Sequence, residues 1–153
     1  MAIRNIRLEK DEILKKKSRE IEVIDDKIQT LIDDMIETMR AAEGCGLAAP
    51  QVGILRRMAV VEVEEGTVYE LINPKIVAYT GEQEEVEGCL SNPGQYGYVK
   101  RPKSVTVRAT NRHGEEYEIV GHDLLARALC HECDHLDGKL YVDKQTRPAK
   151  VKK

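Results

Sequence analysis

The residues best suited to chemistry lie in the segment HECDH, residues 131–135. This segment places His131 and His135 four positions apart, with Glu132 directly after the first histidine. Because residues four apart share one face of a helix, both imidazoles can bind a single divalent metal ion, and the adjacent carboxylate can move a proton. A catalytic metal site takes three protein ligands and keeps one position open, so the segment predicts a metal centre with one ligand still to be found.

The chain beyond His135 offers few candidates for that third ligand. One class of metalloprotease takes it from a histidine at the position where this chain has Tyr141. The acidic residues after His135 are Asp137 and Asp143, so no glutamate completes the other common protease arrangement. The third ligand is therefore expected upstream.

Cys89 is an upstream candidate in an unusual setting. It lies in the stretch EGCLSNPGQ, residues 87–95, where Gly88 lets the backbone approach a metal closely. A thiolate binds a borderline-soft metal tightly. Other upstream candidates are Cys45, His113, His122 and many carboxylates. From the spacing alone, a ligand role for Cys89 and an inert buried thiol are equally open.

Two amphipathic helices flank a strand-rich middle of the chain. Residues 25–42 carry apolar side chains at helical spacing behind an aspartate cap, and Gly44 is expected to end this helix. Residues 122–138 show the same spacing and stop at Gly138. Alternating apolar and polar residues predict strands over residues 56–63, 67–74, 75–80, 104–110 and 117–120. The order of helix, strands and helix predicts the α+β class.

Length and composition limit the protein class. A chain of 153 residues can bury one core, so we expect a single domain over residues 1–147, followed by a basic tail, 148–153, that frays. The formal charge of −3 supplies no basic field for nucleic acid or membrane. The sequence has no apolar run of membrane-spanning length and no hydrophobic signal core, so we expect a cytoplasmic protein.

Three motifs together resemble the bacterial-type peptide deformylases. They are GCGLAAPQ at 44–51, EGCLS at 87–91 and HECDHLDG at 131–138, and they occur in the family's order. The resemblance covers most of the chain. It implies an α+β fold in which antiparallel or mixed strands surround a central helix that carries the two histidines. The implied reaction removes the formyl group from the N-terminal formylmethionine of newly made polypeptides and releases formate.

The resemblance also implies a metal and a set of partners. The family's metal ligands fall on Cys89, His131 and His135. The implied native ion is Fe2+, with Zn2+, Ni2+ or Co2+ as substitutes, and thiolate ligation gives a soft site that can hold ferrous iron. The substrates are nascent N-formylmethionyl peptides. We expect a monomer that can meet these peptides at the ribosome, without nucleic-acid specificity of its own and without a membrane partner.

The remaining roles carry over to individual positions. The family's catalytic carboxylate falls on Glu132, and its oxyanion donors fall on the side chain of Gln51 and the backbone N–H of Leu90. Gly46 and Leu90 match positions that pair with the substrate backbone. The apolar pocket for methionine is expected to be lined by Cys45, Leu124 and Ala128.

This chain departs from the family pattern at two cysteines. Cys45 stands where an aliphatic residue is usual, and Cys130 stands where glutamine is common. Because neither position supplies a ligand or the base, activity should survive, while the shape of the methionine pocket and a hydrogen bond near His131 can differ.

Two other functions fit parts of the sequence. A metallopeptidase with the same histidine motif would cleave internal peptide bonds, but the missing downstream ligand disfavours it. A structural zinc module would use four residues of one helix: Cys130, His131, Cys133 and His135. Their different angles around that helix make convergence on one ion difficult, and the two cysteines are better explained as small core residues.

Overall fold

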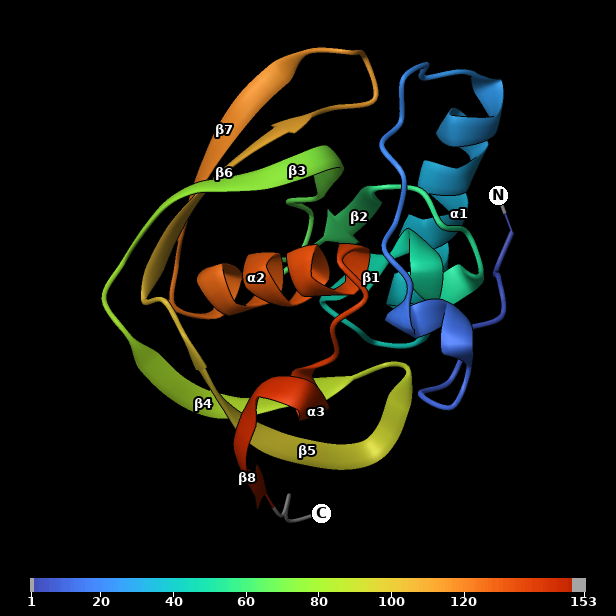
Figure 1. The fold of residues 1–153 in the computed structure, drawn as a ribbon. Helices are drawn as coiled ribbons and strands as arrows, with labels where there is room; N and C mark the ends of the chain where they lie inside the picture. The colour runs from blue at the N-terminus through green and yellow to red at the C-terminus, as the bar shows by residue number, and fades with distance from the viewer. Residues whose placement is uncertain (1, 150–153) are drawn as a thin grey trace.

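The computed structural model describes residues 2–149, which form an α+β fold with two antiparallel sheets (Figure 1). The five-stranded sheet has the order β1-β2-β3-β6-β7, and its strands are Gly46–Ala48, Met58–Val61, Tyr69–Thr80, Ser104–Thr110 and Glu116–His122. The three-stranded sheet has the order β4-β5-β8, with strands Gln83–Cys89, Asn92–Arg101 and Gln145–Ala149. The helices are α1 Asp26–Ala41, α2 Leu124–Leu136 and α3 Tyr141–Lys144, with 3-10 turns at Glu12–Lys15 and Ala49–Val52.

Helix α2 lies between the five-stranded sheet and the β4–β5 hairpin (Figure 1). One side of α2 is apolar and packs Ala126, Leu129 and Leu136 into a core with the inner faces of β6 and β7. That core contains Val105 and Val107, which alternate with outward-facing polar residues along β6. The opposite side of α2 carries the polar residues of the HECDH segment. One face of the helix therefore packs in the apolar core, and the other face bears the candidate functional residues.

Helix α1 confirms the predicted amphipathic helix over residues 25–42. Its cap is Asp25, whose side chain accepts a hydrogen bond from the Ile28 N–H at 3.0 Å. The apolar face packs against β1 and β2 in a second core, which includes Met35 and Met39. No helix within residues 2–149 has the length and apolar character needed to cross a membrane.

The two predicted helix-ending glycines behave differently. Gly138 adopts a left-handed φ of 74° after α2, as the sequence predicts. After α1 the prediction was wrong, because the left-handed residue is Glu43, with φ 57°. Gly44 is needed for another reason: a Cβ there would lie 2.6 Å from a methyl carbon of Leu90, so glycine allows the chain to pass close to that side chain.

The predicted strands were found, but the sequence missed a whole hairpin. The two strands predicted over residues 67–74 and 75–80 are one strand, β3, which starts at Tyr69 and is interrupted by register shifts near Asn73. Strands β4 and β5 form the unpredicted hairpin, and β8 pairs with β5 through Pro148 and Ala149. The remainder of the expected tail, residues 150–153, lies outside the described residues. The hairpin matters for function because its turn begins at Cys89.

Candidate metal centre and substrate cavity

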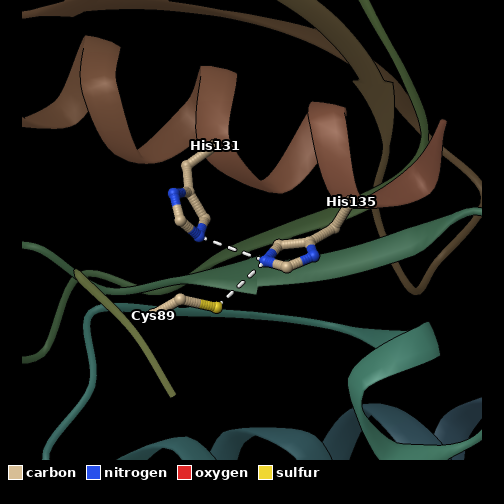
Figure 2. A group of neighbouring side chains, drawn as sticks. All are labelled: Cys89, His131 and His135. Carbon is tan, nitrogen blue, oxygen red and sulfur yellow. Dashed lines mark hydrogen bonds between the residues drawn. The ribbon is translucent and has the colours of Figure 1, made fainter. Parts of the chain in front are cut away.

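The three predicted metal ligands converge, although they come from distant segments (Figure 2). Cys89 is the last residue of β4, and His131 and His135 lie one turn apart on α2. The distance from Cys89 Sγ to His135 Nε2 is 3.3 Å, and the two Nε2 atoms are 3.1 Å apart. All three donor atoms lie within 4.8 Å of one another.

The donor set fits one tetrahedral ion. Bonds of about 2.0–2.1 Å to nitrogen and about 2.3 Å to sulfur separate two nitrogen ligands by about 3.3 Å, and a nitrogen from a sulfur ligand by about 3.6 Å. The two separations that involve His135 Nε2, 3.3 Å to the thiol and 3.1 Å to the other imidazole, are slightly shorter than these values. Burial lowers the pKa of His135 well below its ordinary value, which favours the neutral imidazole that a metal requires. Burial acts in the same direction on His131, but the hydrogen bonds with Cys89 and Glu87 outweigh it and raise the pKa of His131, so a metal would have to displace a proton there. Three ligands leave a fourth position open.

A buried charge network fixes one of the histidines. Glu87 Oε1 lies 3.1 Å from His131 Nδ1, and both carboxylate oxygens of Glu87 accept hydrogen bonds of 2.9 Å from Arg101. Arg101 also donates to Asp134 on α2. Burial alone would raise the pKa of Glu87, but the hydrogen bonds from His131 and Arg101 outweigh it and lower the pKa to about 2. The ionised Glu87 holds the His131 ring with Nε2 facing the metal position.

Gln51 lies beside the thiol in a fully defined orientation. Its side-chain oxygen accepts a hydrogen bond of 2.9 Å from the Ala48 N–H, so its amide nitrogen faces the site. That nitrogen donates to Ser91 Oγ at 3.0 Å and lies 3.5 Å from Cys89 Sγ. Gln51 is almost completely buried, and this fixed N–H group can bind an oxygen atom that approaches the metal position.

Glu132 has the properties of a group that exchanges protons near neutral pH. Burial raises the pKa of Glu132 to about 7. Within the described residues, its buried Oε1 has no hydrogen-bond partner. Its other oxygen fits against Gly46 on β1, where an added Cβ would collide with it. Glycine is therefore required at position 46 to leave room for this carboxylate.

These residues surround a cavity of about 520 Å³. Its wall includes the three residues expected to line the methionine pocket: Cys45, Leu124 and Ala128. Further apolar lining comes from Val86, Leu90 and Tyr96. Strands β1 and β4 are terminal strands of their sheets, and Gly46 and Gly88 bring both of these strands to the cavity. Within residues 2–149, the outer edges of β1 and β4 have no paired strand, so an extended peptide can align with them.

Known proteins are similar to this chain in fold and in sequence. A model of the family described as polypeptide deformylase matches residues 3–151. The chain belongs to the polypeptide deformylase family. It is 58% identical to a peptide deformylase of Acetivibrio thermocellus over 96% of this chain and 86% of that protein. A crystal structure of a peptide deformylase from Legionella pneumophila is 46% identical, with a TM-score of 0.92 over 95% of this chain and 87% of the other. A peptide deformylase from Ehrlichia chaffeensis in complex with actinonin is 39% identical, with a TM-score of 0.93 over 95% and 90% of the two chains.

The two cysteines on the histidine helix lie away from the metal position. Cys130 and Cys133 are buried, and Cys130 belongs to the apolar core beneath the five-stranded sheet. Burial raises the pKa of Cys130 to about 11 and that of Cys133 to about 12, as expected for inert core thiols. Among the residues that the structure describes, neither thiol joins the group of converging ligands. This deformylase-family chain therefore lacks the geometry of a zinc module built on one helix.

Sequence reasoning missed the residues that orient the ligands: Glu87, Ser91, Arg101 and Asp134. One signal was available, because Glu87 and Cys89 are two positions apart and share a face if the segment is a strand. Because the segment was not predicted as a strand, the sequence alone gave no reason to place Glu87 and Cys89 on one face. Arg101 lies 12 positions after Cys89 and reaches Glu87 only through the pairing of β4 with β5.

Proposed function

We propose that this chain is a metal-dependent peptide deformylase. It hydrolyses the formamide on the N-terminal methionine of nascent polypeptides and yields formate and a free amine. The observation that carries this proposal is the convergence of Cys89, His131 and His135 next to Glu132 in a cavity with two free strand edges. Residues 1–147 act as one catalytic domain around α2 as its central helix. The enzyme works in the cytoplasm as a monomer and can meet its substrates at the ribosome.

Cys89, His131 and His135 hold the metal, with Fe2+ as the native ion and Zn2+, Ni2+ or Co2+ as substitutes. A divalent ion bound there would act as a Lewis acid and lower the pKa of water, so that hydroxide would be available to attack an amide near neutral pH. The thiolate and two imidazoles form a soft, electron-rich set that suits ferrous iron. Glu87 keeps the His131 ring oriented for this purpose.

Glu132 serves as the proton carrier of the reaction. Its carboxylate takes a proton from the attacking water and returns it to the leaving nitrogen, so one group acts first as a base and then as an acid. A pKa of about 7 suits both steps, because the group gains and loses a proton with little cost at neutral pH. The contact with Gly46 limits the positions that the carboxylate can take.

Gln51 and the backbone N–H of Leu90 stabilise the charge that develops on the formyl oxygen. The Gln51 amide is held in place before substrate binds, because both ends of its side chain are hydrogen-bonded. Because the donor is already oriented, no free energy is needed to reorient it during the reaction. Losing one donor of this kind costs about 10²–10³-fold in rate.

Substrate specificity comes from one pocket and two strand edges. Cys45, Leu124 and Ala128 receive the methionine side chain, while Gly46 and Leu90 pair with the peptide backbone. Backbone pairing is independent of side chains, so the enzyme reads the first residue and accepts varied residues after it.

The deciding experiment measures formate release from a formyl-methionyl tripeptide by anaerobically purified wild type and Glu132→Gln. Metal content is measured on both proteins. We expect equal metal in the two proteins and a rate about 10²–10⁴-fold lower in the variant, because proton transfer is lost while the ligands remain. No formate release from a fully metallated wild type would refute the proposal.

The same preparations test the two alternatives. The unformylated tripeptide is a matched substrate, and its cleavage at an internal bond would instead indicate a peptidase. A Cys130→Ala/Cys133→Ala double variant should keep its metal, whereas Cys89→Ala should lose it. The reverse pattern would indicate a structural zinc module.

A further inference from the structure

A buried polar contact beside Cys89 is not used by the proposed mechanism. Asn92 Nδ2 donates a hydrogen bond of 3.2 Å to the hydroxyl oxygen of Tyr141. Asn92 is 7% exposed and Tyr141 is 2% exposed, so water does not compete strongly for this bond. Burying two polar groups costs free energy unless they satisfy each other, so the contact constrains both side chains.

The contact joins the two segments that carry the metal ligands. Asn92 is paired with Cys89 across the turn of the β4–β5 hairpin. Tyr141 begins α3, which follows α2 after a short connection from Leu136. The thiol and the two histidines therefore belong to separate pieces of chain, and the Asn92–Tyr141 bond ties these pieces together beside the ligands.

Tyr141 also lies over the ring of a proposed ligand. Its ring stacks on the His131 ring, with centroids 6.2 Å apart and planes inclined by 23°. Glu87 fixes the His131 ring at Nδ1, so the imidazole is held along one edge and on one face. The space between Tyr141, Asn92 and Cys89 is a cavity of about 10 Å³, near the lower limit for one water molecule. A shift of the tyrosine is therefore transmitted to its neighbours.

We propose that Asn92 and Tyr141 are positioning residues that determine how long the site retains its metal ion. The inference rests on the proposed metal centre and extends it to two residues that supply no ligand atom. A metal leaves when one ligand swings away, and the pair resists this motion by holding the cysteine hairpin against the end of the histidine helix. Loss of a supporting group around a metal site typically lowers metal affinity by about 10–100-fold.

The test loads wild type, Tyr141→Phe, Asn92→Leu and the double variant with Co2+ and follows its transfer to a chelator. The visible absorption of Co2+ reports the ligand geometry, independently of catalysis. We expect each single variant to release cobalt about 10-fold faster or more, with an altered spectrum. Since both act through one bond, the double variant should release cobalt no faster than the faster single variant.

Tyr117→Phe is the matched control. Tyr117 is a half-buried tyrosine on β7 whose hydroxyl donates to the Glu70 carbonyl, in the sheet away from the metal position. Its variant should lose some thermal stability and keep the wild-type rate of cobalt release. If Tyr141→Phe loses similar stability but releases cobalt as slowly as wild type, the pair is merely structural and the inference is wrong.

The cobalt experiment also distinguishes an error in the proposed metal centre from an error in the proposed role of Asn92 and Tyr141. A wild type that takes up no cobalt would overturn the proposed metal centre itself. A wild type that holds cobalt, together with single variants whose effects on release add in the double variant, would leave the deformylase proposal intact and refute the coupled pair.

Discussion

The two sides of α2, a helix of thirteen residues, pack against chemically different partners. Towards the five-stranded sheet, Leu129 and Leu136 pack in a core of buried apolar side chains. Towards the three-stranded sheet, the same helix presents His131 and Asp134 to the charged pair of Glu87 and Arg101. Burial of apolar side chains on the first side stabilises the fold, whereas removal of charged groups from water on the second side costs free energy.

The difference indicates what the charged side is for. A buried ion pair is often no more stabilising than apolar residues of the same volume, so stability alone does not account for Arg101. The network instead fixes the direction of His131 and joins β4 to α2. The apolar side supplies stability, whereas the charged side supplies geometry.

Breaking the charged side should produce the largest effect. Arg101→Met leaves the buried Glu87 without its guanidinium partner and removes one of the two cations that contact Asp134, which costs about 3–5 kcal/mol in the free energy of unfolding. The variant should also lose metal, because Glu87 no longer has a fixed position beside His131. Urea unfolding and metal analysis of the same preparation measure both effects.

Leu129→Ala is the corresponding change on the apolar side. It should cost about 2–5 kcal/mol through the cavity that it leaves, yet retain metal in the folded fraction. If the two variants were equally unstable and equally poor in metal, the proposed division between the two sides of α2 would be wrong.

A pair of glycine variants sharpens the comparison at smaller scale. Gly46→Ala pushes a Cβ into Glu132, and a displacement of about 1 Å in a catalytic group can cost about 10²-fold in rate. Gly121→Ala makes the same change against Leu129, whose methyl carbon would lie 2.9 Å from the new Cβ. We expect Gly46→Ala to lower kcat with little change in Tm. Gly121→Ala should lower Tm with little change in kcat, and exchanged phenotypes would contradict this assignment.

The smallest effect is expected at the Arg40–Glu62 ion pair, whose arginine is exposed and which is far less costly to break than the buried network. Arg40 donates two hydrogen bonds to Glu62, of 2.8 and 2.9 Å, and these lower the pKa of Glu62 to about 2 from an ordinary value of 4.5. A lowered pKa in the folded state stabilises the fold above pH 4.5, and this contribution is lost as the pH falls towards 2. Glu62→Gln should lower Tm by about 1–2 °C at neutral pH. The difference should vanish at the acidic end of a Tm series, and one that grew there would reverse the sign.

The same division explains how much the sequence could predict. Helix α1, strand β6 and helix α2 follow from local periodicity, and their apolar faces pack as expected. The β4–β5 hairpin escaped prediction because its strands are rich in glycine and charged residues and lack clear alternation. Of its charged residues, Glu87 and Arg101 are buried, and they pair with each other across the hairpin while Arg101 also pairs with Asp134 on α2.

Among the site residues, motif resemblance pointed to the three proposed ligands but not to the residues that orient them. Cys89, His131 and His135 were found because each lies in a short, specific motif. Asn92 and Tyr141 are 49 positions apart and lie in no motif, so only the fold brings them together. Long-range contacts between ordinary residue types carry no local signal.

The stacking of Tyr141 on His131 has an optical consequence. The chain has six tyrosines and no tryptophan, so tyrosine emission is not drained by energy transfer to an indole. Tyr141 is the tyrosine whose ring stacks on a proposed metal ligand, and a paramagnetic ion bound there should quench its fluorescence. Intrinsic tyrosine fluorescence should therefore report metal occupancy in the unlabelled chain as the ion binds or dissociates.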